Sequence, residues 1–541
     1  MLVTILDGYV DEPSNLGVPP FISPYPRYLA GAVADSGHEY QYVTIDGYRG
    51  GVRLKGDMLA IISGPIVPGK YLRGMPMSQK EILHAAASFE GPKVLGGPLA
   101  RFRGYEEAIE RAFDHVTIRD IDASVFDLLQ GGSFSDRDRT AEEWERWAAF
   151  GAAVAKEHPD FPQPLIAEID ASKGCVRYLT GGCSFCVEPM YGTPKFREVE
   201  GIVNEVKRLH SLGVVNFRLG GMSDFFSYKA KGIGKSPTPM PNVEALGNLL
   251  KGIRRAARGL KVLHTDNADP AMMAAHPDQA MEALRLLVNY ATPGNVLSLG
   301  MESADPDVVE KNNLNSPPET TLKAIEMINA VGSERGENGM PRLLPGLNFV
   351  VGLDGESKST YLLNLNFLRH LLDVGLIVRR INIRQVSPVR RDFDMRHRDM
   401  FRSFKDRVRL DIDHEMLKRV VPTGTVLRDV YTEIKEGNVV FGRQIGTYPL
   451  LVGTPCHLGL GRFFDFKVTG HGQRSVTAVQ YPLDINTANM AAISAIPGIG
   501  SKRAARIVRA RPLRSGADLK ACLDDTATAS GAAAYLSFPP K

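Results

Sequence analysis

The sequence predicts an α/β protein in which two parallel β/α units are followed by a small β module and a helical module. Short apolar strands alternate with helical stretches through roughly the first 400 residues, which is the pattern of parallel sheets covered by helices. Beyond residue 440 short strands divided by Gly predict a small barrel, and beyond residue 484 the pattern is helical. At roughly 100–200 residues per domain, a chain of 541 residues has room for several such units.

The first unit occupies residues 1–130, where each expected strand ends at a turn and a helix, RYLAGAVADSG, ends at Gly37. Ligands on parallel sheets bind beyond the carboxyl ends of the strands, so the loops after these strands are candidate binding loops. Residues 131–150 are charged and polar and predict a linker or a surface helix. The expected strands are VTIL, EYQYVTID, DMLAIISGP, PKVLGGP and DHVTIRD.

The second unit runs from about residue 160 to residue 400, with strands repeated every 40–50 residues or so. This spacing predicts a β/α barrel or partial barrel, whose catalytic residues occupy the carboxyl ends of the strands. The expected strands are LIAEID, VVNFRLGG, KVLHTDN, VLSLGMES, LNFVVGL and RRINIRQVSP.

Composition excludes several classes of protein. The 65 Lys and Arg against 61 Asp and Glu give a net charge of +4, which by itself implies no partner. No apolar run approaches the roughly 18 residues of a membrane span, and the first residues lack the basic start of a signal peptide. Five cysteines are few for a chain of this length, and their number is odd, which argues against a disulfide framework. We therefore expect a cytoplasmic protein without a membrane partner.

Three of the five cysteines, Cys175, Cys183 and Cys186, lie within twelve residues of each other. Three thiolates on one Gly-rich loop suit a soft metal, either zinc or an iron–sulfur cluster with one iron left open. Zinc would need a fourth ligand, and no His lies between Pro159 and His210. Buried thiols without a metal are the third reading. We favour a 4Fe–4S cluster with three cysteine ligands.

Around these cysteines the sequence resembles the radical SAM superfamily, whose usual spacing is C-x3-C-x2-C with an aromatic residue before the last Cys. Phe185 holds that aromatic place, but the first gap here has seven residues. Gly220-Gly221 resembles the glycine motif that receives the amino group of S-adenosylmethionine (SAM), and Glu302-Ser303 resembles the strand end near its ribose. The resemblance implies that these five residues bind SAM and that the open iron chelates it. Reduction then gives a 5′-deoxyadenosyl radical inside a partial (β/α) barrel.

The N-terminal unit is similar to the Rossmann-like cobalamin-binding domains that are fused to radical SAM barrels. The loop after the first strand, the Gly-His-Glu sequence at the end of the first helix and the turns at the strand ends occupy the same positions as in those domains. The D-x-H-x-x-G motif that supplies a histidine to cobalt is absent, so the lower axial ligand is open. A flavodoxin-like domain without a ligand is the alternative. The cobalamin contacts that the resemblance implies are Asn15, Leu16, Gly17, Ser63, Gly64, Gly96 and Gly97.

The C-terminal segment IPGIGSKRAARIVRAR is similar to a helix-hairpin-helix motif, whose turn amides bind nucleic-acid phosphates. Residues 485–522 carry seven Lys or Arg and one Asp, a net charge of +6. Such hairpins also serve in packing or protein docking, and nucleic acid is not the favoured partner. Residues 440–483 resemble a TRAM-like barrel, and the tail at 526–541 is expected to be mobile. The predicted domains are 1–140, 141–415, 416–483 and 484–541.

The whole arrangement resembles archaeal radical SAM proteins that end in a helix-hairpin-helix. The family implies a cobalamin-dependent methyltransferase acting on an unactivated sp3 carbon, with a glutamine of methyl-coenzyme M reductase as the suggested substrate and a separate reductant for the cluster. An RNA-modifying radical SAM enzyme and a nucleic-acid-bound redox sensor are the alternatives. A methylthiotransferase is disfavoured because residues 1–174 contain no cysteine for a second cluster.

Overall fold

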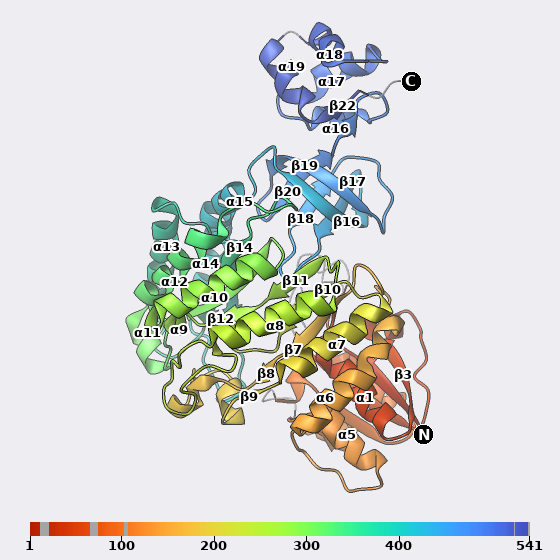
Figure 1. Ribbon diagram of the computed structural model, residues 1–541, viewed down its shortest axis with the longest axis vertical. Coiled ribbons are helices and arrows are strands. Elements are labelled where there is room, and N and C mark those ends of the chain that lie inside the picture. Colours follow the sequence, from red (N-terminus) through yellow and green to blue (C-terminus); the bar gives the residue numbers. More distant parts are fainter. Residues whose placement is uncertain (11–20, 65–73, 102–105, 524, 539–541) are drawn as a thin grey trace.

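The computed structural model describes residues 1–10, 21–64, 74–101, 106–523 and 525–538. Figure 1 shows an N-terminal α/β domain packed beside a second β/α unit, a small barrel above them, and a helical module at the far end. The predicted fold class is confirmed, since an α/β protein with a small β module and a C-terminal helical module is what the chain forms.

Within the described residues the N-terminal sheet has five parallel strands in the order β3-β1-β4-β5-β6. All five predicted strands are present. After β1 the chain adds β3 on one side of it and then adds β4, β5 and β6 on the other side, so the strand order switches between β1 and β4. Open α/β sheets bind ligands at the carboxyl edge of such a switch point. The strands are β1 (Leu2–Asp7), β3 (Glu39–Thr44), β4 (Met58–Ile62), β5 (Lys93–Gly96) and β6 (His115–Val116).

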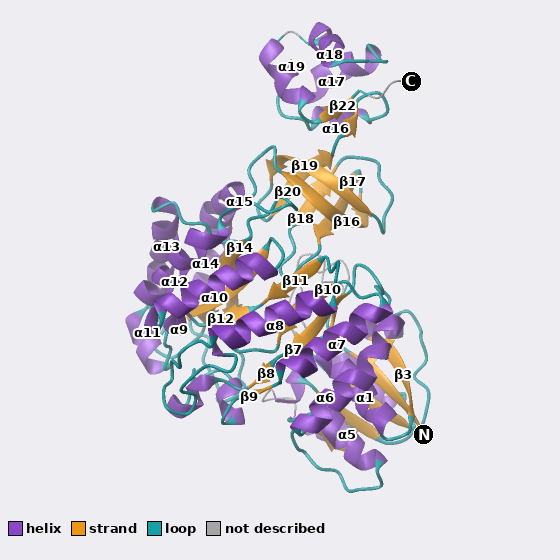
Figure 2. Ribbon diagram, in the orientation of Figure 1, coloured by secondary structure: helices purple, strands orange, loops and turns teal. Residues whose placement is uncertain are grey.

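Helices cover both faces of this sheet, since side chains of α1 and α5 pack in one apolar core and those of α3 and α4 in another. Figure 2 shows the face that carries α1, α5 and α6. The segment expected as a linker or surface helix forms α6, which begins with a capping box at Thr140 and Glu143. Its Trp147 is fully buried and packs beside Ala32 of α1. Gly31 of α1 allows this contact, because a Cβ there would lie 2.1 Å from the Trp147 carbonyl oxygen. The helices are α1 (Pro24–Asp35), α2 (Ile45–Arg49), α3 (Gln79–Ala87), α4 (Glu106–Ala112), α5 (Ile121–Leu129) and α6 (Ala141–Phe150).

The second unit is a partial barrel of parallel strands, in two sheets ordered β11-β10-β7-β2 and β12-β13-β14-β15. The predicted strands are confirmed, but β2 was not expected. It belongs to the Pro-rich stretch after β1 and pairs Phe21 with Ile166 of β7. The strands are β2 (Phe21–Ile22), β7 (Ile166–Asp170), β10 (Asn216–Gly220), β11 (Val262–Thr265), β12 (Asn267–Ala268), β13 (Asn295–Glu302), β14 (Leu343–Val351) and β15 (Arg380–Gln385).

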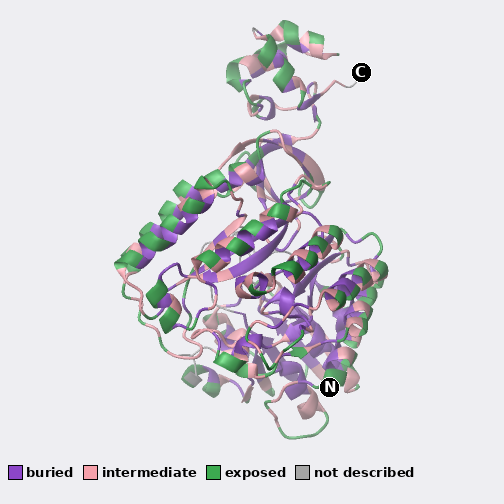
Figure 3. Cartoon of the chain, turned by 60° about the vertical axis from the view of Figure 1, so that its left-hand side comes forward, coloured by how far each residue is buried: buried purple, intermediate pink, exposed green. Residues whose placement is uncertain are grey.

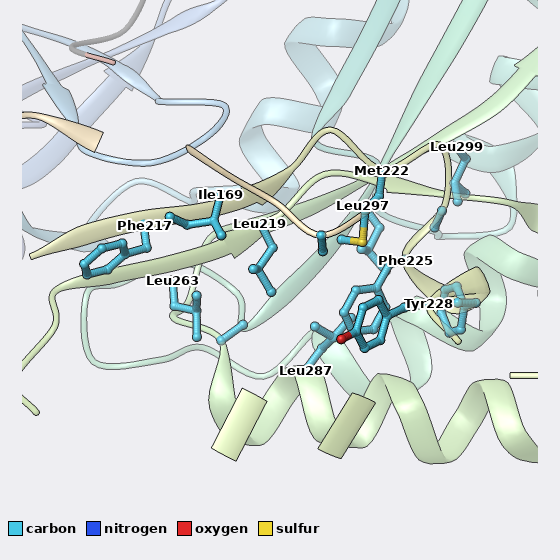
Figure 4. Close-up of a cluster of buried hydrophobic side chains, with 14 of the residues drawn as sticks. Ile169, Phe217, Leu219, Met222, Phe225, Tyr228, Leu263, Leu287, Leu297 and Leu299 are labelled. Carbon is cyan, nitrogen blue, oxygen red and sulfur yellow. The ribbon is translucent and has the colours of Figure 1, made fainter. Parts of the chain in front are cut away.

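Amphipathic helices surround this unit, with exposed and buried turns alternating along them in Figure 3. Figure 4 shows side chains from β7, β10, β11 and β13 meeting in one apolar core, among them Phe217, Leu219 and Leu297. The core fixes the strand ends that carry the candidate site. The helices are α7 (Val199–Leu212), α8 (Val243–Ala256), α9 (Pro270–Ala275), α10 (Pro277–Tyr290), α11 (Pro306–Lys311), α12 (Pro318–Gly332), α13 (Lys358–Asp373), α14 (Arg398–Arg407) and α15 (His414–Val420).

The predicted small barrel is closed, in the order β16-β17-β18-β20-β19. It begins at Val426, earlier than the sequence pattern indicates. Its core is continuous with apolar side chains of the partial barrel, Val296 and Leu344. The strands are β16 (Val426–Glu436), β17 (Val439–Gln444), β18 (Leu451–Thr454), β19 (Phe463–His471) and β20 (Ser475–Gln480).

The C-terminal module contains four short helices, and the expectation of a mobile tail is wrong for its described part. Residues 526–533 form a helix, and Leu536 and Ser537 pair with Leu483 and Asp484. The Tyr535 hydroxyl also donates to the carbonyl oxygen of Val468, 3.1 Å away. No helix among the described residues is both long and apolar enough to cross a membrane. The elements are β21 (Leu483–Asp484), α16 (Met490–Ser494), α17 (Gly500–Arg509), α18 (Gly516–Cys522), α19 (Thr526–Ala533) and β22 (Leu536–Ser537).

Candidate active site

The three clustered cysteines lie on the loop that follows β7, beyond the carboxyl edge of the partial barrel. Two short antiparallel strands, β8 (Ser172–Lys173) and β9 (Lys195–Phe196), close the base of this loop. One 3-10 turn, η3 (Val176–Thr180), separates Cys175 from Cys183, and a second, η4 (Glu188–Tyr191), follows Cys186. All three thiols are free and half-buried, so one loop presents three unpaired sulfur ligands.

Arg177 and Asn313 hold the cysteine loop in shape. Arg177 Nη1 donates to the sulfur of Cys183, 3.1 Å away, and Arg177 Nη2 donates to the Asn313 carbonyl oxygen at 2.6 Å. The Asn313 amide in turn donates to the carbonyl oxygens of Thr180 and Gly182, at 2.8 and 2.9 Å. Asn313 follows α11, far along the chain, and no sequence pattern marks it as a partner of this loop.

Residues in the segments after α11 and β15 also form hydrogen bonds to the cysteine loop. The Ser184 hydroxyl donates to the Asn312 side-chain oxygen at 2.8 Å. Arg390 Nη1 donates to the carbonyl oxygens of Gly181 and Cys183, at 2.8 Å each. Four charged or amide side chains thus fix the loop before any metal binds. Pre-shaped ligand loops of this kind are typical of metal sites, where outer contacts orient the ligands.

The sulfur atoms lie in a partly apolar setting. Burial raises the pKa of Cys183 to about 11 although the Arg177 guanidinium opposes the rise, and burial also raises the pKa of Cys186 and Cys175. Phe185 packs with Cys183 in one apolar cluster. Iron binding must therefore displace protons from the thiols. Within the described residues no three His, Cys, Asp or Glu side chains are placed to hold a single metal ion.

The glycine pair at the end of β10 lies directly over two carboxylates of β7. A Cβ on Gly220 would lie 1.7 Å from Glu168 Oε1, and a Cβ on Gly221 would lie 2.2 Å from Asp170 Oδ1. Gly221 also has φ +67°, a backbone conformation that L side chains rarely adopt. The backbone of Gly221 thus requires glycine, Gly220 leaves room for the Glu168 side chain, and the pair forms a turn with bare backbone at the carboxyl edge.

The glycine turn reaches the cysteine loop through Ser223, whose hydroxyl donates to the Gly174 carbonyl oxygen at 3.0 Å. This contact places the turn beside Cys175. The structure therefore brings together two motifs that lie about 45 residues apart in the sequence.

Glu302 ends β13 in an unusual conformation. Its φ is +65°, and the pairing with β14 is irregular between Gly300 and Glu302. One carboxylate oxygen, Oε2, is buried and has no hydrogen-bond partner among the described residues. Burial raises the pKa of Glu302 to about 8. A strained backbone that carries an unpartnered carboxylate is the arrangement expected of a ligand-binding group.

Unlike the Glu302 carboxylate, the Ser303 side chain already has a hydrogen-bond partner. Its hydroxyl oxygen accepts from the Asp305 amide at 3.1 Å, and the residue is 1% exposed. It shapes the turn into α11. Phe185 packs near Val308 of α11, which brings the cysteine loop and the end of β13 together.

A polar cavity of about 230 Å³ lies between the carboxyl edges of the N-terminal sheet and of the partial barrel. Both edges contribute charged side chains. The lining includes Val10, Tyr25, Tyr28, Arg101, Asp120 and Arg139 from the N-terminal domain and its connection, and Glu168, Asp170, Lys173, Glu188, Tyr191, Arg218 and Gly221 from the barrel.

Several charges in the cavity are paired with each other. Arg139 and Lys173 both contact the Asp120 carboxylate, at 3.2 and 2.9 Å. By contrast, the Asp170 carboxylate has no hydrogen bond or ion pair among the described residues, and burial raises its pKa. The Tyr191 hydroxyl is buried and likewise without a partner in the described part of the chain. The cavity thus presents one open acceptor and one open donor.

Arg101 adds a cation to the same cavity. Its guanidinium lies 5.3 Å from the centre of the Tyr191 ring, and its Nε donates to the Ile118 carbonyl oxygen at 2.8 Å. Neither of its terminal nitrogens has a carboxylate partner among the described residues. The cavity can therefore receive a ligand that both donates and accepts hydrogen bonds.

The predicted cobalamin contacts Asn15, Leu16 and Gly17 lie outside the described residues. Ser63, Gly64, Gly96 and Gly97 lie at the carboxyl edge of β4 and β5 and are all buried. Their small size serves the chain's own packing: a Cβ on Gly64 would lie 1.9 Å from the Tyr9 carbonyl oxygen, and a Cβ on Gly97 2.6 Å from that of Ser63. The Ser63 hydroxyl donates to Gly96 O at 2.9 Å. Close approach of a flat cofactor is not needed to explain these residues, and their role as cobalamin contacts stays a prediction.

The geometry agrees with the comparison to known families. A family model described as the radical SAM superfamily matches residues 171–368, which span the cysteine loop, the glycine turn and Glu302. A helix-hairpin-helix motif model matches residues 480–523. Residues 171–368 thus form a radical SAM domain, and residues 480–523 carry a helix-hairpin-helix motif.

Full-length relatives are archaeal. The chain is 45% identical over 501 residues to the uncharacterized protein MJ0274 of Methanocaldococcus jannaschii, covering 87% of this chain and 92% of that protein. It is 40% identical over 538 residues to an uncharacterized protein of Archaeoglobus fulgidus, covering 96% and 97%. The chain belongs to the same family as these two proteins.

Among solved structures, the radical SAM methyltransferase TsrM of Kitasatospora setae, with cobalamin and a 4Fe–4S cluster bound, is similar with a TM-score of 0.49 and 13% identity. That likeness covers 72% of this chain and 77% of TsrM.

Proposed function

We propose that this radical SAM enzyme is a cobalamin-dependent methyltransferase that C-methylates an unactivated sp3 carbon of a protein, with a glutamine Cα of methyl-coenzyme M reductase as the candidate target. The observation that carries the proposal is the polar cavity between the two sheet edges. A substrate held there faces Gly221 of the glycine turn on one side and the N-terminal domain on the other.

The cluster and SAM fit the residues at the carboxyl edge of the barrel. A 4Fe–4S cluster on Cys175, Cys183 and Cys186 supplies, when bound, the electron that splits SAM to a 5′-deoxyadenosyl radical. Arg177 donates to the Cys183 sulfur and so favours its thiolate form. The open oxygen of Glu302 can accept from the ribose hydroxyls.

The open groups of the cavity suit a carboxamide. The Asp170 carboxylate accepts hydrogen bonds, while the Tyr191 hydroxyl and the Arg101 guanidinium donate them. A carboxamide offers an NH2 donor and a carbonyl acceptor at once, which a hydrocarbon side chain does not. A volume of about 230 Å³ suits one side chain and its backbone. Asp170, Tyr191 and Arg101 would thereby orient the carbon that loses hydrogen and exclude water from it.

Cobalamin, when bound, supplies a methyl group that an alkyl radical can take up. The sequence resemblance of the N-terminal domain and the open switch point between β1 and β4 support this part of the proposal. The four described residues predicted to touch cobalamin are occupied by the chain's own contacts, so no step is assigned to them.

The test is an anaerobic assay with reconstituted enzyme, cobalamin, dithionite and SAM labelled with deuterium in its methyl group. A peptide that carries the glutamine of methyl-coenzyme M reductase should gain a labelled methyl group. Tyr191→Phe should lower this product while SAM cleavage persists, since it removes only a cavity donor. Absence of cobalamin binding by absorbance, or of labelled peptide with the intact enzyme, would contradict the proposal.

Modification of RNA is the second candidate, because the helical module carries a net charge of +6 over residues 485–522. Figure 1 shows this module projecting beyond the small barrel, where its basic helix α17 can meet another molecule. A parallel incubation with transfer RNA distinguishes the two candidates. Labelled RNA without labelled peptide would favour RNA modification.

A further inference from the structure

The loop between β17 and β18 leaves the small barrel and packs against the two units that precede it. We call this loop, residues 445–450, the insertion loop. Near its start, Ile445 packs against the apolar cluster that includes Ile166 of β7. Near its end, the Pro449 carbonyl oxygen accepts from Arg379 Nη2 at 3.3 Å, directly before β15. The insertion loop therefore reaches across the partial barrel, from the cluster beside β7 to the start of β15.

The middle of the insertion loop is fixed against β11. The Thr447 amide donates to His264 Nδ1 at 3.1 Å, and both residues are buried. Burial lowers the pKa of His264 to about 4, so the ring is neutral at ordinary pH and its Nδ1 can accept. Gly446 lies over the same ring, because a Cβ there would lie 2.7 Å from His264 Cε1. The backbone of the loop is thus fitted closely to the barrel.

Tyr448 carries the insertion loop to a buried carboxylate of the partial barrel. Its hydroxyl donates to Asp266 Oδ1, and its ring lies 3.8 Å from the Arg380 guanidinium. The other carboxylate oxygen, Asp266 Oδ2, accepts from Arg218 Nη2 at 2.9 Å. Asp266 is therefore held by the small barrel through one oxygen and holds Arg218 through the other.

Arg218 is the member of this chain of contacts that lines the polar cavity, and Glu168 lines it as well. Arg218 Nη2 lies 3.3 Å from Glu168 Oε1, so one guanidinium stands between two carboxylates. Glu168 in turn packs against Gly220 of the glycine turn, where a Cβ would lie 1.7 Å from Glu168 Oε1. The position of the Arg218 charge in the cavity thus depends on both carboxylates, and one of them depends on Tyr448.

We propose that Tyr448 is a positioning residue, whose hydroxyl fixes Asp266 and thereby fixes the Arg218 guanidinium in the cavity that binds the substrate peptide. The inference rests on the proposed function, because it assumes that the peptide occupies this cavity. Without the hydroxyl, Asp266 Oδ1 loses its donor while it stays buried, which is costly for a carboxylate. The carboxylate then turns to take two hydrogen bonds from Arg218 and draws the guanidinium away from Glu168. The small barrel is in this sense a part of the active site.

The experiment compares the unaltered enzyme with Tyr448→Phe, which keeps the ring beside Arg380 and removes only the hydroxyl. The matched control is Tyr535→Phe, because it removes a tyrosine hydroxyl that donates to the Val468 carbonyl oxygen at 3.1 Å, within the two C-terminal modules. Full-length reconstituted proteins are assayed with cobalamin, dithionite, methyl-labelled SAM and a range of concentrations of the glutamine peptide. We measure both labelled peptide and 5′-deoxyadenosine.

We expect the KM for the peptide to rise about tenfold in Tyr448→Phe, since a displaced cavity charge weakens the hold on the substrate. The rate of deoxyadenosine formation at saturating peptide should not change, because neither Tyr448 nor Asp266 contacts the cysteine loop. Tyr535→Phe should match the unaltered enzyme in both measurements. An unchanged KM in Tyr448→Phe would overturn the inference. An equal rise in Tyr535→Phe would do so too, because it would mean a general loosening of the fold.

A second measurement does not depend on the substrate. The melting temperatures of Tyr448→Phe, Arg218→Lys and the double variant are compared with that of the unaltered protein. Contact through Asp266 predicts that the double variant loses less than the sum of the two single losses. Additive losses would show that Tyr448 does not hold Arg218. If the unaltered enzyme labels no peptide, the proposed function fails, while this comparison still decides whether the small barrel positions Arg218.

Discussion

Replacing Glu302 by Gln tests whether the carboxylate at the end of β13 is held for a ligand. Glu302 has a left-handed backbone and one buried oxygen without a partner among the described residues. Burial raises its pKa from the usual 4.5 to about 8. In the absence of SAM the folded protein therefore binds this proton more tightly than the unfolded chain does.

The sign and size of the effect follow from that shift. A carboxyl whose pKa is raised on folding stabilises the fold less as the pH rises from 4.5 toward 8. Between pH 6 and pH 9 the free energy of unfolding should lose up to about 2.5 kcal/mol through Glu302. Gln does not ionise, so Glu302→Gln should lack this loss. For a chain of this length the difference corresponds to a melting temperature at pH 9 that is roughly 2 °C higher in the variant, relative to the difference at pH 6.

The assay is thermal unfolding of SAM-free protein at pH 6 and pH 9, followed by circular dichroism. Glu326→Gln is the matched control, because Glu326 is exposed on α12 and should show no pH-dependent difference. Glu302→Gln should also weaken SAM binding. If the variant and the unaltered protein respond equally to pH, the carboxylate is not buried as described and the reasoning fails.

Three further outcomes follow from individual contacts. Asn313→Ala removes the hydrogen bonds of the Asn313 side chain to Arg177 and to the carbonyl oxygens of Thr180 and Gly182, so iron affinity should fall about tenfold; iron content equal to that of an Asn204→Ala control would contradict this. Gly31→Ala puts a Cβ 2.1 Å from the Trp147 carbonyl oxygen, so the free energy of unfolding in urea should fall by about 1–3 kcal/mol; an unchanged urea midpoint would refute the α1–α6 contact. Deleting residues 526–541 removes α19 and β22, so the helical module should become sensitive to protease; a module as resistant as before would mean that the tail is not part of its core.

Regular strands were predictable because their signals are local. The predicted strands of both β/α units carry apolar residues at successive or alternating positions and end at a turn, and this pattern needs no distant partner. β2 was missed because two residues in a Pro-rich stretch give no strand signal, and only pairing with β7 orders them. The tail was misjudged for a similar reason: its small residues suggest mobility, yet Tyr535 and Leu536 gain their order from β19 and β21.

In the candidate site, too, some residues could be predicted from local sequence and others could not. The cysteines, Gly220-Gly221 and Glu302 stand out in the sequence because their spacing or type is unusual. Asn313 and Arg390 do not, because they reach the cysteine loop from 136 and 209 residues away. The open groups of the cavity, Asp170 and Tyr191, become visible only when two domains are packed together. Sequence thus reveals the ligands, and the fold reveals what positions them.

The most direct test of the central claim is the amount of 5′-deoxyadenosine formed from SAM by anaerobically reconstituted protein after reduction with dithionite. We expect deoxyadenosine from the unaltered protein and none from Cys186→Ala, which leaves two cysteines on the loop. Iron-loaded protein that forms no deoxyadenosine, or a Cys186→Ala variant that forms as much as the unaltered protein, would contradict the assignment of this loop to SAM cleavage.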